Sequence, residues 1–187
     1  MGDWPRAIFA LVCGQDVLHT WAPGGVLLPC CQRCTGLYVG AAIALALHLG
    51  LRIRAGSRFL QVHGLFLLAM IPLGFHWIPQ DAVARTVSGF LYGAGLVSFF
   101  WLLPGPALAR LTPMSSPALA TYIVVVGAGA AAVPALGRLG GTGAAHALVW
   151  LALLGLLGLA LLALANLGLA ARWIVGRALA GGSGVRS

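Results

Sequence analysis

The sequence contains five long apolar stretches. Short polar segments, or segments rich in glycine and proline, separate them. The apolar stretches cover residues 35–52, 59–78, 86–104, 117–136 and 146–171. A helix that crosses the hydrocarbon core of a bilayer needs about 20 mostly apolar residues, and each stretch comes close to or exceeds that length. The pattern therefore predicts five membrane-spanning helices, of which the last is long enough to tilt or to project from the bilayer.

The first 34 residues follow a different pattern. The apolar run 7–13 is too short to span a bilayer, and it is followed by Asp16, His19 and the turn sequence Ala-Pro-Gly-Gly. We therefore expect an amphipathic or re-entrant cap over residues 1–34 that carries the cysteines. An all-α transmembrane bundle should follow over residues 35–175, and a flexible tail over residues 176–187.

The composition supports a polytopic membrane protein. The chain is 60% hydrophobic and only 7% charged, with a mean hydropathy of +0.99, whereas about a quarter of the residues of a soluble domain are charged. Its net charge of +8 comes from eleven arginines against three aspartates. These arginines stand at the ends of apolar runs and form no basic stripe with interleaved aromatic residues, so they do not indicate nucleic-acid binding. The expected partner is the lipid bilayer, with another membrane protein or a second copy of the chain left open.

The arginines also predict an orientation. On an alternating five-span path, one side of the membrane holds Arg52, Arg54, Arg58, Arg110, Arg172, Arg177 and Arg186. The other side holds Arg6, Arg33, Arg85 and Arg138. Because loops on the cytoplasmic side carry an excess of basic residues, the protein is expected in the cell (inner) membrane with its N-terminus outside and its C-terminus in the cytoplasm.

Four cysteines lie in the predicted cap and at the start of the first span. They are Cys13, Cys30, Cys31 and Cys34, with His19 nearby. Cys31 and Cys34 form a C-x-x-C motif at the expected N-terminus of a helix, where the helix dipole and Arg33 favour the thiolate. The thiolate is the form of cysteine that binds a metal or attacks a disulfide.

Three interpretations of these cysteines remain open from the sequence. A metal site would use Cys13, Cys31 and Cys34, with His19 or Cys30 as the fourth ligand, and its tetrahedral sulfur and nitrogen ligands favour zinc. Such a site would have a structural, sensing or assembly role. A thiol–disulfide or quinone-coupled oxidoreductase would instead use Cys31 and Cys34 as an exchanging pair. In a structural subunit, two stable disulfides would hold the cap in place.

Further polar residues are expected at the same membrane face. His76 ends the second span, and Asp81 and Arg85 begin the third. Asp81 and Arg85 are four residues apart, which is the spacing of an ion pair on a helix surface. A role in a proton or anion pathway is the alternative.

A repeated pattern links the first and third spans. The sequences RCTGLYVGA (33–41) and RTVSGFLYGA (85–94) both place an arginine before two glycines four residues apart. Glycines one helical turn apart allow close helix packing. We expect Gly36 and Gly40 of the first span to pack against Gly89 and Gly93 of the third, with Arg33 and Arg85 at one level.

The sequence lacks the motifs of several common activities. It contains no glycine-rich phosphate loop, no His-Glu-x-x-His motif, no serine nucleophile elbow and no paired carboxylates. With three acidic residues in all, acid–base or two-metal hydrolysis would be hard to build. No catalytic residue can be assigned from the sequence, and the central spans carry almost no charge for a channel or transporter.

The segment LPCCQRCTGLYVG resembles the signature of a family of small prokaryotic membrane proteins known only as a domain of unknown function. That signature is approximately C-H…P-x-C-A-R-C-T-G-[IL]-Y-x-G. The matching residues are Pro29, Cys31, Arg33, Cys34, Thr35, Gly36, Tyr38 and Gly40, and a second, shorter motif matches Arg85, Ser88, Gly89 and Gly93. The resemblance covers about residues 13–100 and places the family's first cysteine on Cys13.

The resemblance also implies a ligand set. The cysteine, histidine and C-x-x-C of the family signature would supply three sulfur ligands and one nitrogen ligand for zinc. This sequence has Gly14 in place of the histidine and Gln32 in place of the alanine, and its loop before Arg85 is shorter. His19 or Cys30 would therefore have to replace the missing ligand.

Overall fold

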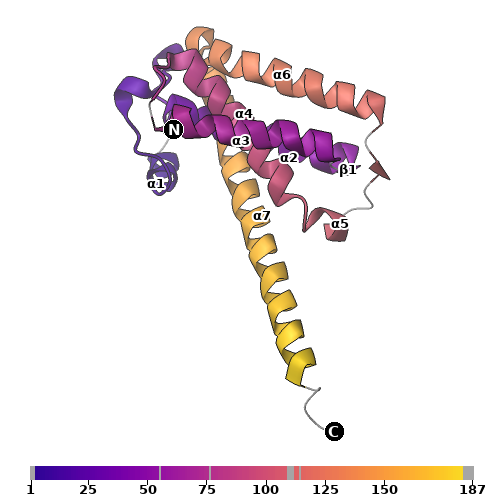
Figure 1. Cartoon of the computed structure of the whole chain (residues 1–187). Helices are drawn as coiled ribbons and strands as arrows, with labels where there is room; N and C mark the ends of the chain where they lie inside the picture. Colours follow the sequence, from indigo (N-terminus) through magenta and orange to yellow (C-terminus); the bar gives the residue numbers. More distant parts are fainter. Residues whose placement is uncertain (1–2, 55, 76, 109–111, 114, 183–187) are drawn as a thin grey trace.

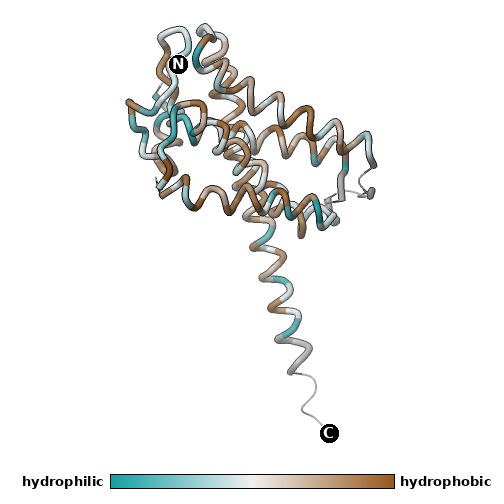
Figure 2. Tube along the Cα trace, turned by 45° about the horizontal axis from the view of Figure 1, so that its top comes forward, coloured by the Kyte–Doolittle hydropathy of each residue, from teal (hydrophilic) through white to brown (hydrophobic). Residues whose placement is uncertain are grey.

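Within the part of the chain that the structure describes, five helices are long and apolar enough to cross a bilayer (Figure 1). The structure is a computed structural model and describes residues 3–54, 56–75, 77–108, 112–113 and 115–182. The five helices are α2 (Gln32–Leu51), α3 (Ser57–Gly74), α4 (Ala82–Phe100), α6 (Ser116–Leu139) and α7 (Thr142–Gly182). Hydrophobic residues predominate along these helices (Figure 2), and many of their large apolar side chains are exposed.

Short polar residues set the ends of these helices. The Asp81 carboxylate accepts a hydrogen bond of 2.7 Å from the amide of Ala84 and so caps α4. The Ser115 hydroxyl accepts one of 3.4 Å from the amide of Ala118 at the start of α6. Such caps satisfy amides that have no partner in the first turn of a helix. At its C-terminal end, α2 stops where Arg52 takes a left-handed conformation with φ of 49°.

Helix α2 lies at the centre of the bundle. It packs against α4, α6 and α7, while α3 packs mainly against α4. The core between these helices contains Val39 and Ala44 of α2 together with Phe90 and Val97 of α4, all 1% exposed or less. The other faces of the long helices expose large apolar side chains, which suits a bilayer environment.

Helices α2 and α4 run parallel and cross through their glycines. Gly36 and Gly40 of α2 lie against the backbone carbonyls of Thr86 and Phe90, and Gly89 and Gly93 of α4 lie against those of Arg33 and Leu37. A Cβ atom at any of these four glycines would overlap a carbonyl oxygen. The missing side chains therefore allow the two backbones to touch.

The N-terminal cap covers the first turns of α2 and α4. It consists of α1 (Trp4–Ala10) and two 3₁₀ turns, η1 (Val17–His19) and η2 (Pro23–Gly25). Phe9 of α1 is fully buried beside Tyr38, and Gly24, with φ of 60°, lies against the backbone of Gly141 and Thr142. The prediction of an all-α bundle of about five spans with a cysteine-bearing cap is thus confirmed.

Among the described residues, the opposite end of the bundle carries only short elements. These are α5 (Gly105–Leu108) and a parallel pair of two-residue strands, β1 (Ile53–Arg54) and β2 (Thr112–Pro113). The two strands form a small two-stranded parallel sheet, in which Ile53 pairs with Thr112 and Arg54 with Pro113.

Helix α7 leaves the bundle in its second half (Figure 1). Its 41 residues correspond to about 60 Å of α-helix, roughly twice the thickness of the hydrocarbon core. Residues 176–182, which were expected to belong to the C-terminal tail, continue α7 as a helix. No proline interrupts this stretch, and Ala178, Leu179 and Ala180 are good helix formers between its glycines. Residues 183–187 lie outside the described residues.

Candidate metal centre

Three cysteines from two separate elements meet at the capped end of the bundle. The Sγ atoms of Cys13, Cys31 and Cys34 all lie within 4.8 Å of one another. Cys31 is the N-cap residue of α2 and Cys34 lies in its first turn, so their spacing of three residues places both on one side of the helix start. Cys13 follows α1 and is brought to them by the cap.

Backbone amides hold the Cys13 sulfur in place. The amide of Cys31 donates to Cys13 Sγ at 3.3 Å, and the amide of Gln15 donates to the same atom at 3.4 Å. Two N–H donors directed at one sulfur favour its thiolate form.

Gln15 shapes this loop and was not among the residues expected from the sequence. Its backbone has φ of 51°, a left-handed conformation that is uncommon for residues other than glycine. Its side-chain amide donates to the carbonyls of Arg6 at 2.7 Å and Pro29 at 2.9 Å. Gln15 therefore ties α1 to the segment before Cys31. In the sequence, only its place after Cys13-Gly14, in a short polar stretch, hints at a tight turn.

The thiols of the cluster differ in pKa. Hydrogen bonds from the thiols of Cys31 and Cys34 lower the pKa of Cys13 from the ordinary cysteine value to about 2. The same hydrogen bond, in which Cys31 is the donor, raises the pKa of Cys31. The free cluster is thus one thiolate held by two thiols. A metal that binds all three sulfurs as thiolates would displace the two thiol protons.

Cys30 does not join the cluster, although it was considered as a fourth ligand. Its side chain is 2% exposed, and its sulfur lies 3.4 Å from the hydroxyl of Thr35. Burial raises the pKa of its thiol to about 12, so Cys30 stays protonated at neutral pH. Its neighbour Cys31 faces the cluster, and the two adjacent side chains point to different surroundings.

His19 lies near the cluster but outside the group of three sulfurs. It lines a cavity of about 280 Å³ together with Cys31, Cys34, Arg33 and Arg85, among others. Its Nδ1 atom is 2.7 Å from the carboxylate of Asp16, and this contact leaves Nε2 as the nitrogen that remains for a ligand role. A carboxylate that orients a histidine in this way is frequent behind metal-binding histidines.

Of the polar residues expected beside the cysteines, the two arginines lie there and Asp81 has another role. Arg33 and Arg85 both line the cavity beside the cysteines, and Arg33 Nη2 donates to the carbonyl of Leu73 at 2.9 Å. Asp81 serves as the N-cap of α4, and the ion pair suggested for Asp81 and Arg85 does not form among the residues that the structure describes. The carboxylate bonds to the first-turn amide instead. His76 lies outside the described residues.

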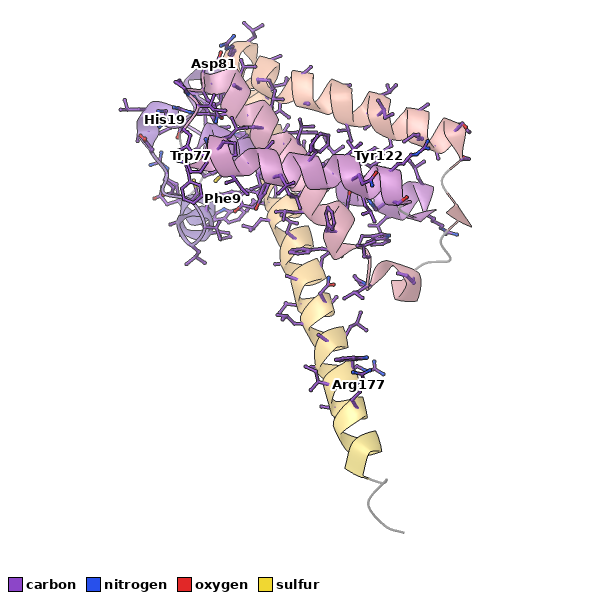
Figure 3. All side chains as sticks on the ribbon, viewed as in Figure 1. Phe9, His19, Trp77, Asp81, Tyr122 and Arg177 are labelled. Carbon is purple, nitrogen blue, oxygen red and sulfur yellow. The ribbon has the colours of Figure 1, made fainter. Side chains whose placement is uncertain are left out.

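None of the four cysteines forms a disulfide in this structure. The site is therefore a cluster of three neighbouring sulfurs with two arginines and a carboxylate-paired histidine at the wall of the adjoining cavity. Figure 3 shows His19 and Asp81 at the same end of the bundle. These features define a multi-pass membrane protein with a thiol-based site at one end.

Comparison with known families agrees with this class. Residues 13–99 match the model of the DUF2085 family, whose description is "Predicted membrane protein", and the resemblance to an uncharacterised family of membrane proteins is thereby confirmed. The match begins at Cys13 and includes the three clustered cysteines and both glycine pairs. No match was found among curated proteins or among solved structures.

Proposed function

We propose that the protein binds a metal ion of the zinc type through Cys13, Cys31 and Cys34. The observation that supports this function is the approach of three sulfurs from two elements to within 4.8 Å of one another. In a tetrahedral zinc site with Zn–S bonds of about 2.3 Å, neighbouring sulfurs lie about 3.8 Å apart. The three thiols therefore need to move together by about 1 Å at most to surround an ion.

The fourth ligand distinguishes a closed site from an open one. His19 lines the cavity next to Cys31 and Cys34, and its ring is oriented by Asp16. If His19 binds, the site has four protein ligands, as structural zinc sites do. We propose this closed arrangement, with a structural, sensing or assembly role, because paired acidic groups for hydrolysis are absent from the sequence.

The proposed setting is the cell (inner) membrane, with the cysteines at the outer face and the C-terminus in the cytoplasm. The support is the distribution of arginines, seven on the C-terminal side against four on the other. A C-terminal fluorescent protein and a C-terminal alkaline phosphatase test this orientation. Fluorescence without phosphatase activity supports it, and the reverse would place the cysteines in the cytoplasm.

Metal analysis of the purified full-length protein tests the proposed function. We expect about one equivalent of metal per chain, lost in each of Cys13→Ser, Cys31→Ser and Cys34→Ser. Cys30→Ser is the matched control, since it removes a neighbouring thiol that lies outside the cluster, and it should keep the metal. Loss of metal from His19→Ala with the three sulfurs intact supports the closed site.

A thiol–disulfide oxidoreductase is the second candidate. The observation that favours it is the thiolate of Cys13 directly beside the C-x-x-C pair Cys31 and Cys34. A metal-free protein in which Cys31 and Cys34 form and release a disulfide reversibly would replace the metal proposal with this one. Disulfides that resist mild reductant would instead leave a structural subunit with a stapled cap.

A further inference from the structure

A second cavity lies between α3 and α6 and shares no residue with the cysteine site. It has a volume of about 730 Å³, within the range of about 300–1,000 Å³ typical of ligand pockets. Its walls are formed largely by apolar and aromatic side chains, among them Phe59, Val62 and Phe66 of α3 and Leu119, Ile123 and Val126 of α6. Figure 3 shows Tyr122, which also lines it, toward the opposite end of the bundle from His19. This cavity is named the α3–α6 groove.

Two buried polar side chains in the wall of the groove satisfy each other. His63 Nδ1 is 2.8 Å from the carbonyl of Phe59, and a carbonyl only accepts, so Nδ1 carries the proton. Nε2 is then an acceptor, and the Tyr122 hydroxyl donates to it at 2.8 Å. Both side chains are 3% exposed. The groove wall at this depth is therefore apolar, and its two polar side chains need no hydrogen-bond partner from a ligand.

One end of the groove is polar and positively charged. Gly56, Ser57 and Arg58 line it there, and Ser57 and Arg58 are the exposed first residues of α3. The N-cap Gly56 provides no side-chain acceptor for the first-turn amides of α3. The exposed Arg52, at the end of α2, precedes this turn.

The positive charge at this end has no acidic counterpart in the chain. The sequence has three acidic residues, Asp3, Asp16 and Asp81. Asp3 and Asp16 belong to the cap, and Asp81 begins α4 beside it. An apolar groove with an uncompensated arginine at its mouth matches an amphiphile with a negative head group. Basic pockets between membrane helices bind anionic lipid head groups by this complementarity.

We propose that the α3–α6 groove binds an anionic phospholipid, with one acyl chain between α3 and α6 and the phosphate at Ser57 and Arg58. The hydrogen bond between His63 and Tyr122 spans the two helices and forms part of the wall against which the chain packs. This site is independent of metal binding at the cysteines.

Native mass spectrometry of the full-length protein in mild detergent tests the proposal. The probes are phosphatidylglycerol and phosphatidylcholine with identical acyl chains, added in equal amounts. Gly127→Leu fills the groove, because Gly127 lines it and a Cβ there meets no atom within 4 Å. Arg58→Gln removes the charge at the mouth. The matched controls are Gly168→Leu, which is equally open but lies on α7, and Arg138→Gln, at the other end of α6.

We expect the unmodified protein to retain phosphatidylglycerol in preference to phosphatidylcholine. Arg58→Gln should reduce that preference about fivefold, which is the effect of one basic residue near an anionic head group. Gly127→Leu should lower the retention of both lipids, and the two controls should match the unmodified protein. Equal retention of both lipids, or full retention of lipid by Gly127→Leu, would overturn the proposal. So would a neutral quinone that co-purifies with the protein and whose retention does not change in Arg58→Gln.

Discussion

The indole nitrogen of Trp21 donates a buried hydrogen bond of 2.9 Å to the hydroxyl of Thr86. Trp21 belongs to the cap and Thr86 to α4, so this bond joins two elements that are 65 residues apart. The Thr86 hydroxyl itself donates to the carbonyl of Ala82 at 2.8 Å. The ring of Trp21 also lies against Gly137 near the end of α6. One side chain thus links the cap to two membrane helices.

Thr86→Val should destabilise the protein by about 1–3 kcal/mol. Valine has nearly the shape of threonine but leaves the buried Trp21 N–H without an acceptor, and that is the typical cost of such a group. Unfolding in mixed detergent, followed by circular dichroism, measures the change. Thr121→Val on the exposed face of α6 is the control and should be neutral. Equal stability of Thr86→Val and the unmodified protein would show that this bond does not hold the cap.

Substitution of the crossing glycines should separate α2 from α4. In Gly36→Ala and Gly89→Ala, the new methyl group would overlap the carbonyls of Thr86 and Arg33. Because these are backbone atoms, the helices must move apart, and overpacking of this kind costs typically about 1–3 kcal/mol.

The same unfolding measurement tests the glycine contacts. Gly127→Ala on α6 is the matched control, since its added Cβ meets no atom within 4 Å. It should be neutral or slightly stabilising, because alanine favours a helix over glycine by about 1 kcal/mol. A similar change in stability for Gly36→Ala and Gly127→Ala would contradict the close crossing of α2 and α4.

The helical bundle was predictable because length and apolarity decide which segments can cross a bilayer. The paired motifs around Gly36 and Gly89 also led to the expectation of a contact between the first and third spans, and in the structure these glycines lie at the α2–α4 crossing. The ends of the helices were harder to predict. Helix α2 begins at Gln32, and α7 extends to Gly182, since a hydropathy pattern does not register polar residues that continue a helix.

The cysteine cluster was only partly predictable. The proximity of Cys31 and Cys34 follows from their spacing at a helix start. The position of Cys13 depends on the path of the cap, which is set by the left-handed turn at Gln15 and by the Trp21–Thr86 bond. The local sequence also gave no means of separating Cys30 from Cys31. Burial of Cys30 beside Thr35 is a tertiary effect.

Asn166→Leu should weaken the attachment of α7 to α4. The Asn166 side-chain amide donates to the carbonyl of Phe100 at 2.8 Å and to that of Leu162 at 2.7 Å. Hydrogen bonds between membrane helices contribute about 0.6 kcal/mol on average and about 1.7 kcal/mol at most, so we expect a loss in this range. Leu164→Ala, at an exposed position two residues earlier, is the control. A loss no larger than that of the control would contradict this bond.

Alkylation of the metal-free protein at different pH values should distinguish Cys13, Cys30 and Cys31. Because the pKa of Cys13 is lowered to about 2, its thiolate fraction is constant between about pH 6 and about pH 8. An ordinary cysteine, with a pKa of about 8.5, gains thiolate by nearly two orders of magnitude over that interval. Cys30, with a pKa raised to about 12 and a side chain that is 2% exposed, should remain unmodified throughout.

Iodoacetamide labelling followed by peptide mass spectrometry gives the rate at each cysteine. The rate at Cys13 should be low, because a weakly basic thiolate is a weak nucleophile, but flat with pH. The rate at Cys31, whose pKa is raised by its hydrogen bond to Cys13, should climb with pH. Cys30→Ser should reproduce both profiles, since Cys30 lies outside the cluster. If the labelling rate at Cys13 rises with pH as steeply as the rate at Cys31, Cys13 is not the thiolate of the cluster.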